Sequence, residues 1–144
     1  MARIADVMNL RLVSVRPDES VQTAIARMLE EDVGSVAVCD GSRLVGIFTE
    51  RDVLRLAGQE GGIAEVRVGD VMTTAVITLS PDDEVLAAAE LMGAKRIRHL
   101  PVVQDGNVLG LVGIRDVLRV IVERLWREHD AAAHDTARHL LGRS

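Results

Sequence analysis

Residues 46–55 read Gly-Ile-Phe-Thr-Glu-Arg-Asp-Val-Leu-Arg, and residues 110–119 read Gly-Leu-Val-Gly-Ile-Arg-Asp-Val-Leu-Arg. In each stretch a short apolar run typical of a strand leads into a charged segment typical of the first turns of a helix. The two stretches lie 64 residues apart. A strand-to-helix unit that occurs twice predicts that a larger unit is also present twice.

The same spacing relates much of the remaining chain. The tripeptide Asp-Val-Met occurs at 6–8 and again at 70–72. An ungapped alignment of 3–55 with 67–119 has 16 identities in 53 positions, where composition alone gives about four or five. The chain is therefore an internal duplication. Two copies do not make a repeat array, and they indicate a pseudo-twofold pair.

Each copy predicts the same series of elements, β-α-β-β-α, so the expected fold class is mixed α+β. Apolar spacing and turn residues place the elements of both copies. In copy one we expect a strand over 12–15, a helix opened by Pro17-Asp18, strands over 35–39 and 44–48, and a helix from Glu50. In copy two we expect a strand over 76–78, a helix over 81–93 capped by Ser80 and Asp83, strands over 100–103 and 108–112, and a helix from Ile114.

These elements predict the organisation of the chain. We expect copy one over 3–57, a glycine-rich linker over 58–65, copy two over 66–120 and a helical C-terminal tail over 121–144. One copy of about 60 residues is marginal by itself, so the two copies are expected to share a core.

Composition excludes several classes of protein. The chain has 144 residues, of which 48% are hydrophobic and 27% charged, as in ordinary globular proteins. The single cysteine, Cys39, cannot form an internal disulfide and suggests a reducing compartment. No apolar run could span a membrane, and the start has no signal-peptide pattern. We therefore expect a cytoplasmic protein, and the net charge of -5 argues against nucleic-acid binding.

The aromatic residues are only Phe48 and Trp126, so the core must be aliphatic. Cys39 ends an expected strand and is interpreted as a small buried residue. Trp126 lies on the apolar face of an expected helix. Because tryptophan is enriched at protein interfaces, we expect it to contact a partner subunit.

The repeated motif carries the chemistry that could bind a ligand. Thr49 offers a hydroxyl at a helix start, Arg51 a guanidinium suited to phosphate, and Asp52 a carboxylate suited to ribose hydroxyls. An alternative interpretation is a capping box, in which Thr49 and Asp52 only close the helix end. In copy two Gly113 replaces the hydroxyl while Arg115 and Asp116 persist, which predicts two unequal sites.

With its duplication and its Gly-hydrophobic-x-Thr-x-x-Asp motif, the chain resembles a tandem pair of cystathionine-β-synthase (CBS) domains, also called a Bateman module. The resemblance covers about 3–120. It implies an adenosine ligand (AMP, ADP, ATP, NAD or NADH, or S-adenosylmethionine) in clefts between the copies. It also implies regulation rather than catalysis, and a homodimer.

The resemblance also implies which residues bind the nucleotide. Asp52 and Asp116 would hold ribose hydroxyls, and Thr49 would contact a phosphate. Residues of the first and middle strands would frame adenine, namely Ser14, Val15, Gly34, Ser35, Val36, Ile77, Thr78, His99, Leu100 and Pro101. The basic run 95–99 replaces an acidic run of copy one, so Arg98, with Arg51 and Arg115, is expected to hold phosphates.

We therefore expect a regulatory module, with no catalytic residues, no catalytic cofactor and no metal, that signals to an unknown target protein. The tail is too short to be an effector domain. His129, His134 and His139 are five residues apart, which does not place them on one helix face. Two alternatives remain at this point: a homodimerisation module without a ligand, and an enzyme acting on a nucleotide.

Overall fold

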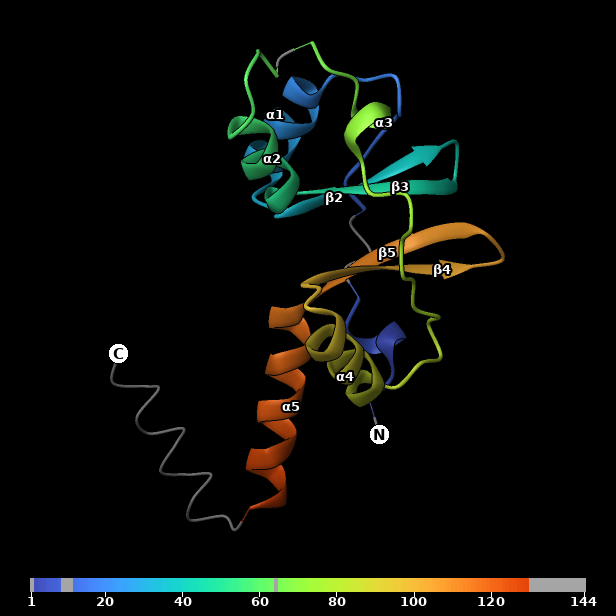
Figure 1. The fold of residues 1–144 in the computed structure, drawn as a ribbon. Coiled ribbons are helices and arrows are strands. Elements are labelled where there is room, and N and C mark those ends of the chain that lie inside the picture. The colour runs from blue at the N-terminus through green and yellow to red at the C-terminus, as the bar shows by residue number, and fades with distance from the viewer. Residues whose placement is uncertain (1, 9–11, 64, 130–144) are drawn as a thin grey trace.

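The computed structural model describes residues 2–8, 12–63 and 65–129, and it shows the expected mixed α+β fold (Figure 1). A short 3-10 helix, η1, spans Ile4–Asp6. The elements of copy one are β1 Ser14–Val15, α1 Val21–Glu31, β2 Ser35–Asp40, β3 Arg43–Thr49 and α2 Glu50–Ala57. Those of copy two are α3 Val68–Val71, α4 Val85–Lys95, β4 His99–Gln104, β5 Asn107–Gly113 and α5 Ile114–Glu128.

The two hairpins form the middle of the molecule, with α1 and α2 on one side and α4 and α5 on the other (Figure 1). The strand order is β1-β2-β3-β5-β4, and β3 meets β5 only where Arg43 pairs with Asn107. The backbone N–H of Val108 donates to the carbonyl of Ser42 at 3.0 Å at this junction. The copies are thus joined at the turn ends of their hairpins.

The hairpins repeat each other in detail. β2 pairs with β3 through a register shift between Val38 and Cys39, and β4 pairs with β5 through a shift between Val102 and Val103. These positions are equivalent under the 64-residue spacing. The duplication seen in the sequence is therefore present in the backbone, including its irregularity.

The chain has two main aliphatic cores, each built mostly from one copy, and a smaller cluster joins them. Phe48 is buried in copy one among side chains such as Val21 and Met28, and copy two has an equivalent cluster around Leu100. The third cluster unites Ala37 and Cys39 of copy one with Val108 of copy two. The shared core and the burial of Cys39 are thus confirmed, and burial raises the pKa of this thiol.

The opening segments of the two copies are exchanged. Ile4, from the start of copy one, is fully buried in the core of copy two, and its N–H donates to the carbonyl of Asp83 at 2.8 Å. Val68, from the start of copy two, is fully buried in the core of copy one, and its N–H donates to the carbonyl of Glu19 at 2.9 Å. Figure 1 shows η1 beside α4, and α3 on the side of α1 and α2.

The predicted starts of α1 and α4 were wrong, and the exchange of segments explains why. Both helices begin about four residues later than expected, at Val21 and Val85. The N–H of Val85 donates to the carbonyl of Ala2, so a segment from the other copy satisfies it. Ser80 and Asp83 bond to each other in the preceding turn and do not cap the helix.

Two further expectations concern the segments around copy two. Residues 76–78 form no strand, and only an isolated bridge joins Leu79 to Val102. Helix α5 runs through the expected tail boundary as far as Glu128. The rest of the tail, including His134 and His139, lies outside the described residues.

Gly46 lies where the two copies approach each other closely. A Cβ at this position would lie 2.5 Å from Met72 Sδ and 2.9 Å from the backbone carbonyl of Thr73. Because Thr73 is fixed by two backbone hydrogen bonds to Ile47, we expect Gly46→Ala to lower the free energy of unfolding by about 1–3 kcal/mol.

Gly93 provides the control, because it lies in α4 and a Cβ there would meet nothing within 4 Å. We expect Gly93→Ala to raise the free energy of unfolding by about 0.5–1 kcal/mol, since alanine favours the helix. Urea denaturation of both variants measures the effect, and equal changes would contradict the proposed crowding at Gly46.

Candidate functional site

A cleft of about 500 Å³ lies between the copies, where β3 runs into α2. Copy one contributes Ile47 and the stretch from Thr49 to Asp52, together with Leu54 and Arg55. Copy two contributes Thr73, residues 75–77 and residues 96–100. A ligand in this cleft would contact both copies.

Asp52 is the buried acid of the cleft, with only 3% of the residue exposed. Its Oδ2 accepts from the backbone N–H of Thr49 at 2.9 Å and from the Thr49 hydroxyl at 3.2 Å. Its Oδ1 accepts from Arg55 Nη2 in an ion pair. The capping box considered from the sequence is therefore present, and it holds the Asp52 carboxylate in a fixed position at the cleft.

The equivalent acid in copy two is held in a similar way but is more exposed. Asp116 Oδ2 accepts from the N–H of Gly113 at 3.3 Å, and Oδ1 accepts from Arg119 at 3.3 Å. Its side chain is 33% exposed, against 4% for Asp52. With no hydroxyl at Gly113, Asp116 accepts only the longer backbone bond in its capping box, so the two helix starts differ.

Arginines outnumber carboxylates in the cleft, since four Arg line it against Glu50 and Asp52. Arg51 and Arg55 come from α2, and Arg96 and Arg98 come from the connection between α4 and β4. Arg96 ends α4 in the left-handed conformation, with φ of 55°. Guanidinium groups on two walls of one cleft suit an anion, and phosphate above all.

His99 lies near the start of α2, at Glu50, and the start of α5, at Arg115 and Asp116. A Cβ at Gly34 would lie 3.1 Å from His99 Cε1, and one at Gly113 would lie 3.7 Å from His99 Cδ2. Burial lowers the pKa of His99, and the nearby charges act in both directions. Glu50 and Asp116 raise the pKa, whereas Arg98 and Arg115 lower it.

Apolar side chains complete the cleft. Ile47 from β3, Leu100 from β4, and Val76 and Ile77 from the segment before Leu79 line it. No Phe, Tyr or Trp lies among the lining residues, and the imidazole of His99 is the one ring there. A base in this cleft would therefore be held mainly between aliphatic side chains.

The structure brings seven of the predicted site residues into this cleft, namely Thr49, Arg51, Asp52, Ile77, Arg98, His99 and Leu100. The others lie outside its lining, namely Ser14, Val15, Gly34, Ser35, Val36, Thr78, Pro101, Arg115 and Asp116. Several of these are buried instead, since Val15, Ser35 and Val36 are at most 2% exposed. The pseudo-twofold relation explains most of the division, because this cleft combines the helix start of copy one with Thr73, residues 75–77 and residues 96–100 of copy two. Thr78 and Pro101 also belong to copy two but lie outside the lining.

Sequence reasoning missed nine lining residues: Ile47, Glu50, Leu54, Arg55, Thr73, Ala75, Val76, Arg96 and Ile97. For the two arginines among them, the sequence contained a feature that could have identified them. Arg55 is part of the repeated motif, and Arg96 belongs to the basic run of copy two. The segment around Thr73 had none, because only the bridge to Ile47 places it beside the motif.

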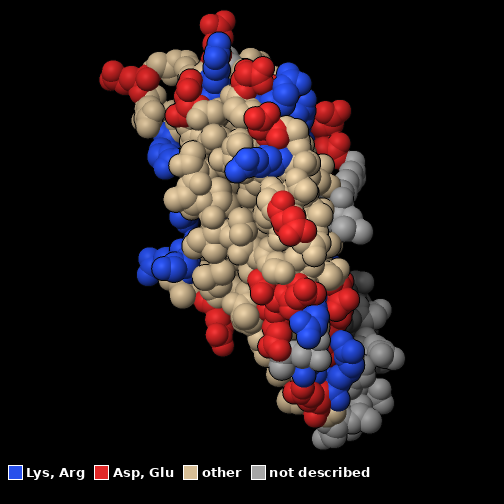
Figure 2. Space-filling view, turned by 90° about the vertical axis from the view of Figure 1, so that its right-hand side faces the viewer, with Lys and Arg blue, Asp and Glu red and all other residues tan. Residues whose placement is uncertain are grey.

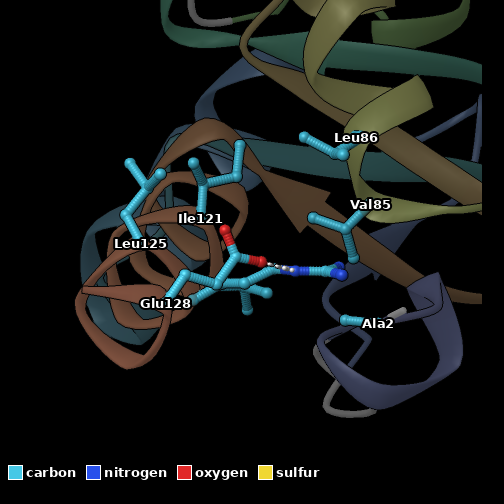
Figure 3. A pocket seen from close by; sticks show the side chains of 8 residues that line it. Ala2, Val85, Leu86, Ile121, Leu125 and Glu128 are labelled. Atoms are coloured by element: carbon cyan, nitrogen blue, oxygen red, sulfur yellow. Dashed lines mark hydrogen bonds and ion pairs between the residues drawn. The ribbon is translucent and has the colours of Figure 1, made fainter. Parts of the chain in front are cut away.

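Other surfaces carry less chemistry. Figure 2 shows the face toward which both hairpin turns point, and its middle is mostly uncharged. A smaller groove of about 200 Å³ lies between α4 and α5, with Leu86 and Ile121 on its walls and an Arg124–Glu128 ion pair at 3.1 Å (Figure 3).

Within the described residues no group of three potential ligands could hold a metal ion. None of the described helices is long and apolar enough to cross a bilayer.

The capping role of the two acids can be measured directly. Loss of a capping group costs about 0.5–2 kcal/mol. We expect Asp52→Ala to lower the free energy of unfolding more than Asp116→Ala, because it leaves the more deeply buried bonds unmade. Urea denaturation compares the two, and a smaller loss for Asp52→Ala would contradict this ranking.

The lowered pKa of His99 predicts that the free energy of unfolding depends on pH. Its pKa lies below the ordinary 6.5 in the folded chain, so unfolding takes up a proton between the folded pKa and 6.5. We therefore expect stability to fall as the pH drops from 6.5 through the folded pKa. His99→Gln should remove this part of the pH dependence, and His129→Gln, at an exposed position, should not. Equal profiles for the wild type and His99→Gln would contradict the assignment.

Comparison with known proteins agrees with the duplicated architecture. The family model of the CBS domain matches residues 4–58 and again residues 68–123. The mitochondrial CBS domain-containing protein CBSX3 of Arabidopsis thaliana is 40% identical over 111 residues, which are 73% of this chain and 54% of that protein. This chain thus spans about half the length of that relative.

Solved structures show the same fold. A CBS-domain-containing protein from Agrobacterium tumefaciens superposes with a TM-score of 0.75 at 29% identity, covering 83% of this chain and 98% of that one. CBSX2, solved in complex with AMP, superposes with a TM-score of 0.73 at 28% identity, covering 84% of this chain and 96% of that one. The chain belongs to the CBS-domain family, and its two exchanged copies are a pair of CBS domains.

Proposed function

We propose that this CBS pair is a regulatory module that binds an adenine nucleotide in the cleft between its copies. The observation that carries the proposal is the placement of Asp52. This buried carboxylate lies at one wall of the cleft, and Arg96 and Arg98 come from the opposite copy. A carboxylate suits a pair of ribose hydroxyls, and guanidinium groups suit phosphates.

The shape of the cleft supports the same class of ligand. Aliphatic residues such as Ile47, Ile77 and Leu100 offer apolar walls for a base. A cleft of about 500 Å³ lies within the ordinary range of small-molecule sites. The relative CBSX2 was solved with AMP, which makes AMP the first ligand to test. ADP, ATP and NAD or NADH contain the same adenosine group.

Binding would signal through the arrangement of the copies. The cleft is lined from both of them, so a ligand stabilises whichever relative orientation it fits better. No catalytic set of residues is part of the proposal. The expectations of a homodimer, a separate target protein and a cytoplasmic location stay predictions, as does the contact of Trp126 with a partner subunit.

A thermal-shift panel tests the proposal on nucleotide-stripped protein with AMP, ADP, ATP, NAD, NADH and S-adenosylmethionine, and with GMP as the control. A ligand at 100 times its Kd adds about 2.7 kcal/mol to stability. We expect an adenine nucleotide to raise the Tm of the wild type, and Asp52→Asn to remove most of that increase relative to its own ligand-free Tm.

Asp116→Asn is the matched variant, because Asp116 has the same place in copy two but does not line this cleft. We expect it to retain the increase. A panel in which no adenine compound at millimolar concentration shifts the Tm would overturn the proposal. The motif would then serve only as a helix cap, and the ligand-free dimerisation module would be the remaining interpretation.

A further inference from the structure

We propose that Arg55 makes the cleft select phosphorylated nucleosides over unphosphorylated ones. In the structure Arg55 occupies one of the two carboxylate positions that a pair of ribose hydroxyls would use, and a phosphate on the ligand gives its guanidinium a new partner. The inference rests on the proposed function and adds a specificity-determining residue to it.

The first step concerns the oxygens of Asp52. Oδ2 already accepts from both the N–H and the hydroxyl of Thr49, at 2.9 and 3.2 Å. Oδ1 accepts from Arg55 Nη2. A carboxylate has about four acceptor positions, and those of Oδ2 are filled from within the helix start. One position therefore remains, on Oδ1, beside the bond from Arg55. A pair of ribose hydroxyls needs two positions, so the second hydroxyl competes with Arg55.

The second step concerns access. The Asp52 side chain is 4% exposed, whereas that of Arg55 is 57% exposed. Both residues line the cleft. The ion pair thus joins a buried carboxylate to an exposed guanidinium, so Arg55 is the partner that can move away. Displacing it removes a charge-assisted bond from a buried carboxylate, which is unfavourable unless another anion replaces it.

The third step concerns what Arg55 meets when it leaves Asp52. Arg51, Arg96 and Arg98 line the same cleft, and Glu50 is the one lining carboxylate besides Asp52. A displaced guanidinium is thus added to three others, against a single further carboxylate. A neutral nucleoside brings no negative charge to this group. A nucleotide brings a phosphate, which a guanidinium binds through two parallel hydrogen bonds. The cost of displacing Arg55 is therefore offset more fully for a phosphorylated ligand.

Copy two provides an internal comparison. Arg119 pairs with Asp116 at the same spacing, at 3.3 Å. Pairing between these positions is thus a property of both helix starts. Only in copy one is the acid almost fully buried and the arginine part of the cleft lining. This difference makes Arg119→Gln the matched control for Arg55→Gln.

The experiment is isothermal titration of adenosine and of AMP into the wild type, Arg55→Gln and Arg119→Gln. We expect the wild type to bind AMP more tightly than adenosine. In Arg55→Gln we expect adenosine to bind more tightly and AMP more weakly than in the wild type. The preference for AMP should fall by about tenfold, which corresponds to about 1.4 kcal/mol. Arg119→Gln should keep the wild-type preference.

Arg55→Lys gives a second test should Arg55→Gln unfold, since it keeps a charge but loses the paired donors. We expect a preference between those of the wild type and Arg55→Gln. The inference is overturned if Arg55→Gln, or Arg55→Lys in its place, keeps the wild-type preference, or if the wild type binds adenosine as tightly as AMP. In those cases the proposed function stands. If the wild type binds neither compound nor any adenine compound of the thermal-shift panel, the proposed function and the inference both fail.

Discussion

The structure depends on the exchange of opening segments between the two copies. Ile4 fills the core of copy two and Val68 fills the core of copy one, each fully buried. The same segments satisfy backbone groups at the helix starts, as the bond from Val85 to Ala2 shows. Neither core is complete with the residues of one copy. The exchange therefore fixes the copies face to face, and the cleft between them follows from that arrangement.

Within that cleft one carboxylate has two roles. Asp52 closes the start of α2 through Thr49 and also faces the ligand space beside Arg55. The capping and binding interpretations are thus compatible, because the cap holds the carboxylate where a ribose could reach it. In copy two Gly113 has no hydroxyl and Asp116 is more exposed. The duplicated motif keeps its structural role in both copies, while the surroundings of its acid have diverged.

The duplication, the hairpins and the helix from Glu50 could be predicted from the sequence, because repeated spacing and local turn residues determine them. The start of α1 could not, because Val21 donates to the carbonyl of Val66, which belongs to the other copy. Only part of the cleft lining could be predicted, for a similar reason. Thr49 and Asp52 carry a local motif, whereas Thr73 and Val76 reach the site only through the pairing of Thr73 with Ile47.

The exchange also sets the order in which the chain can fold during synthesis. Copy one leaves the ribosome first, but its core lacks Val68 until the start of copy two has emerged. Ile4 is made before the rest of copy one, and its backbone partner Asp83 is made only with copy two. Contacts over such separations close slowly, because chain entropy is lost before the contacts form. We therefore expect the two cores to be completed together, after the start of copy two has been made.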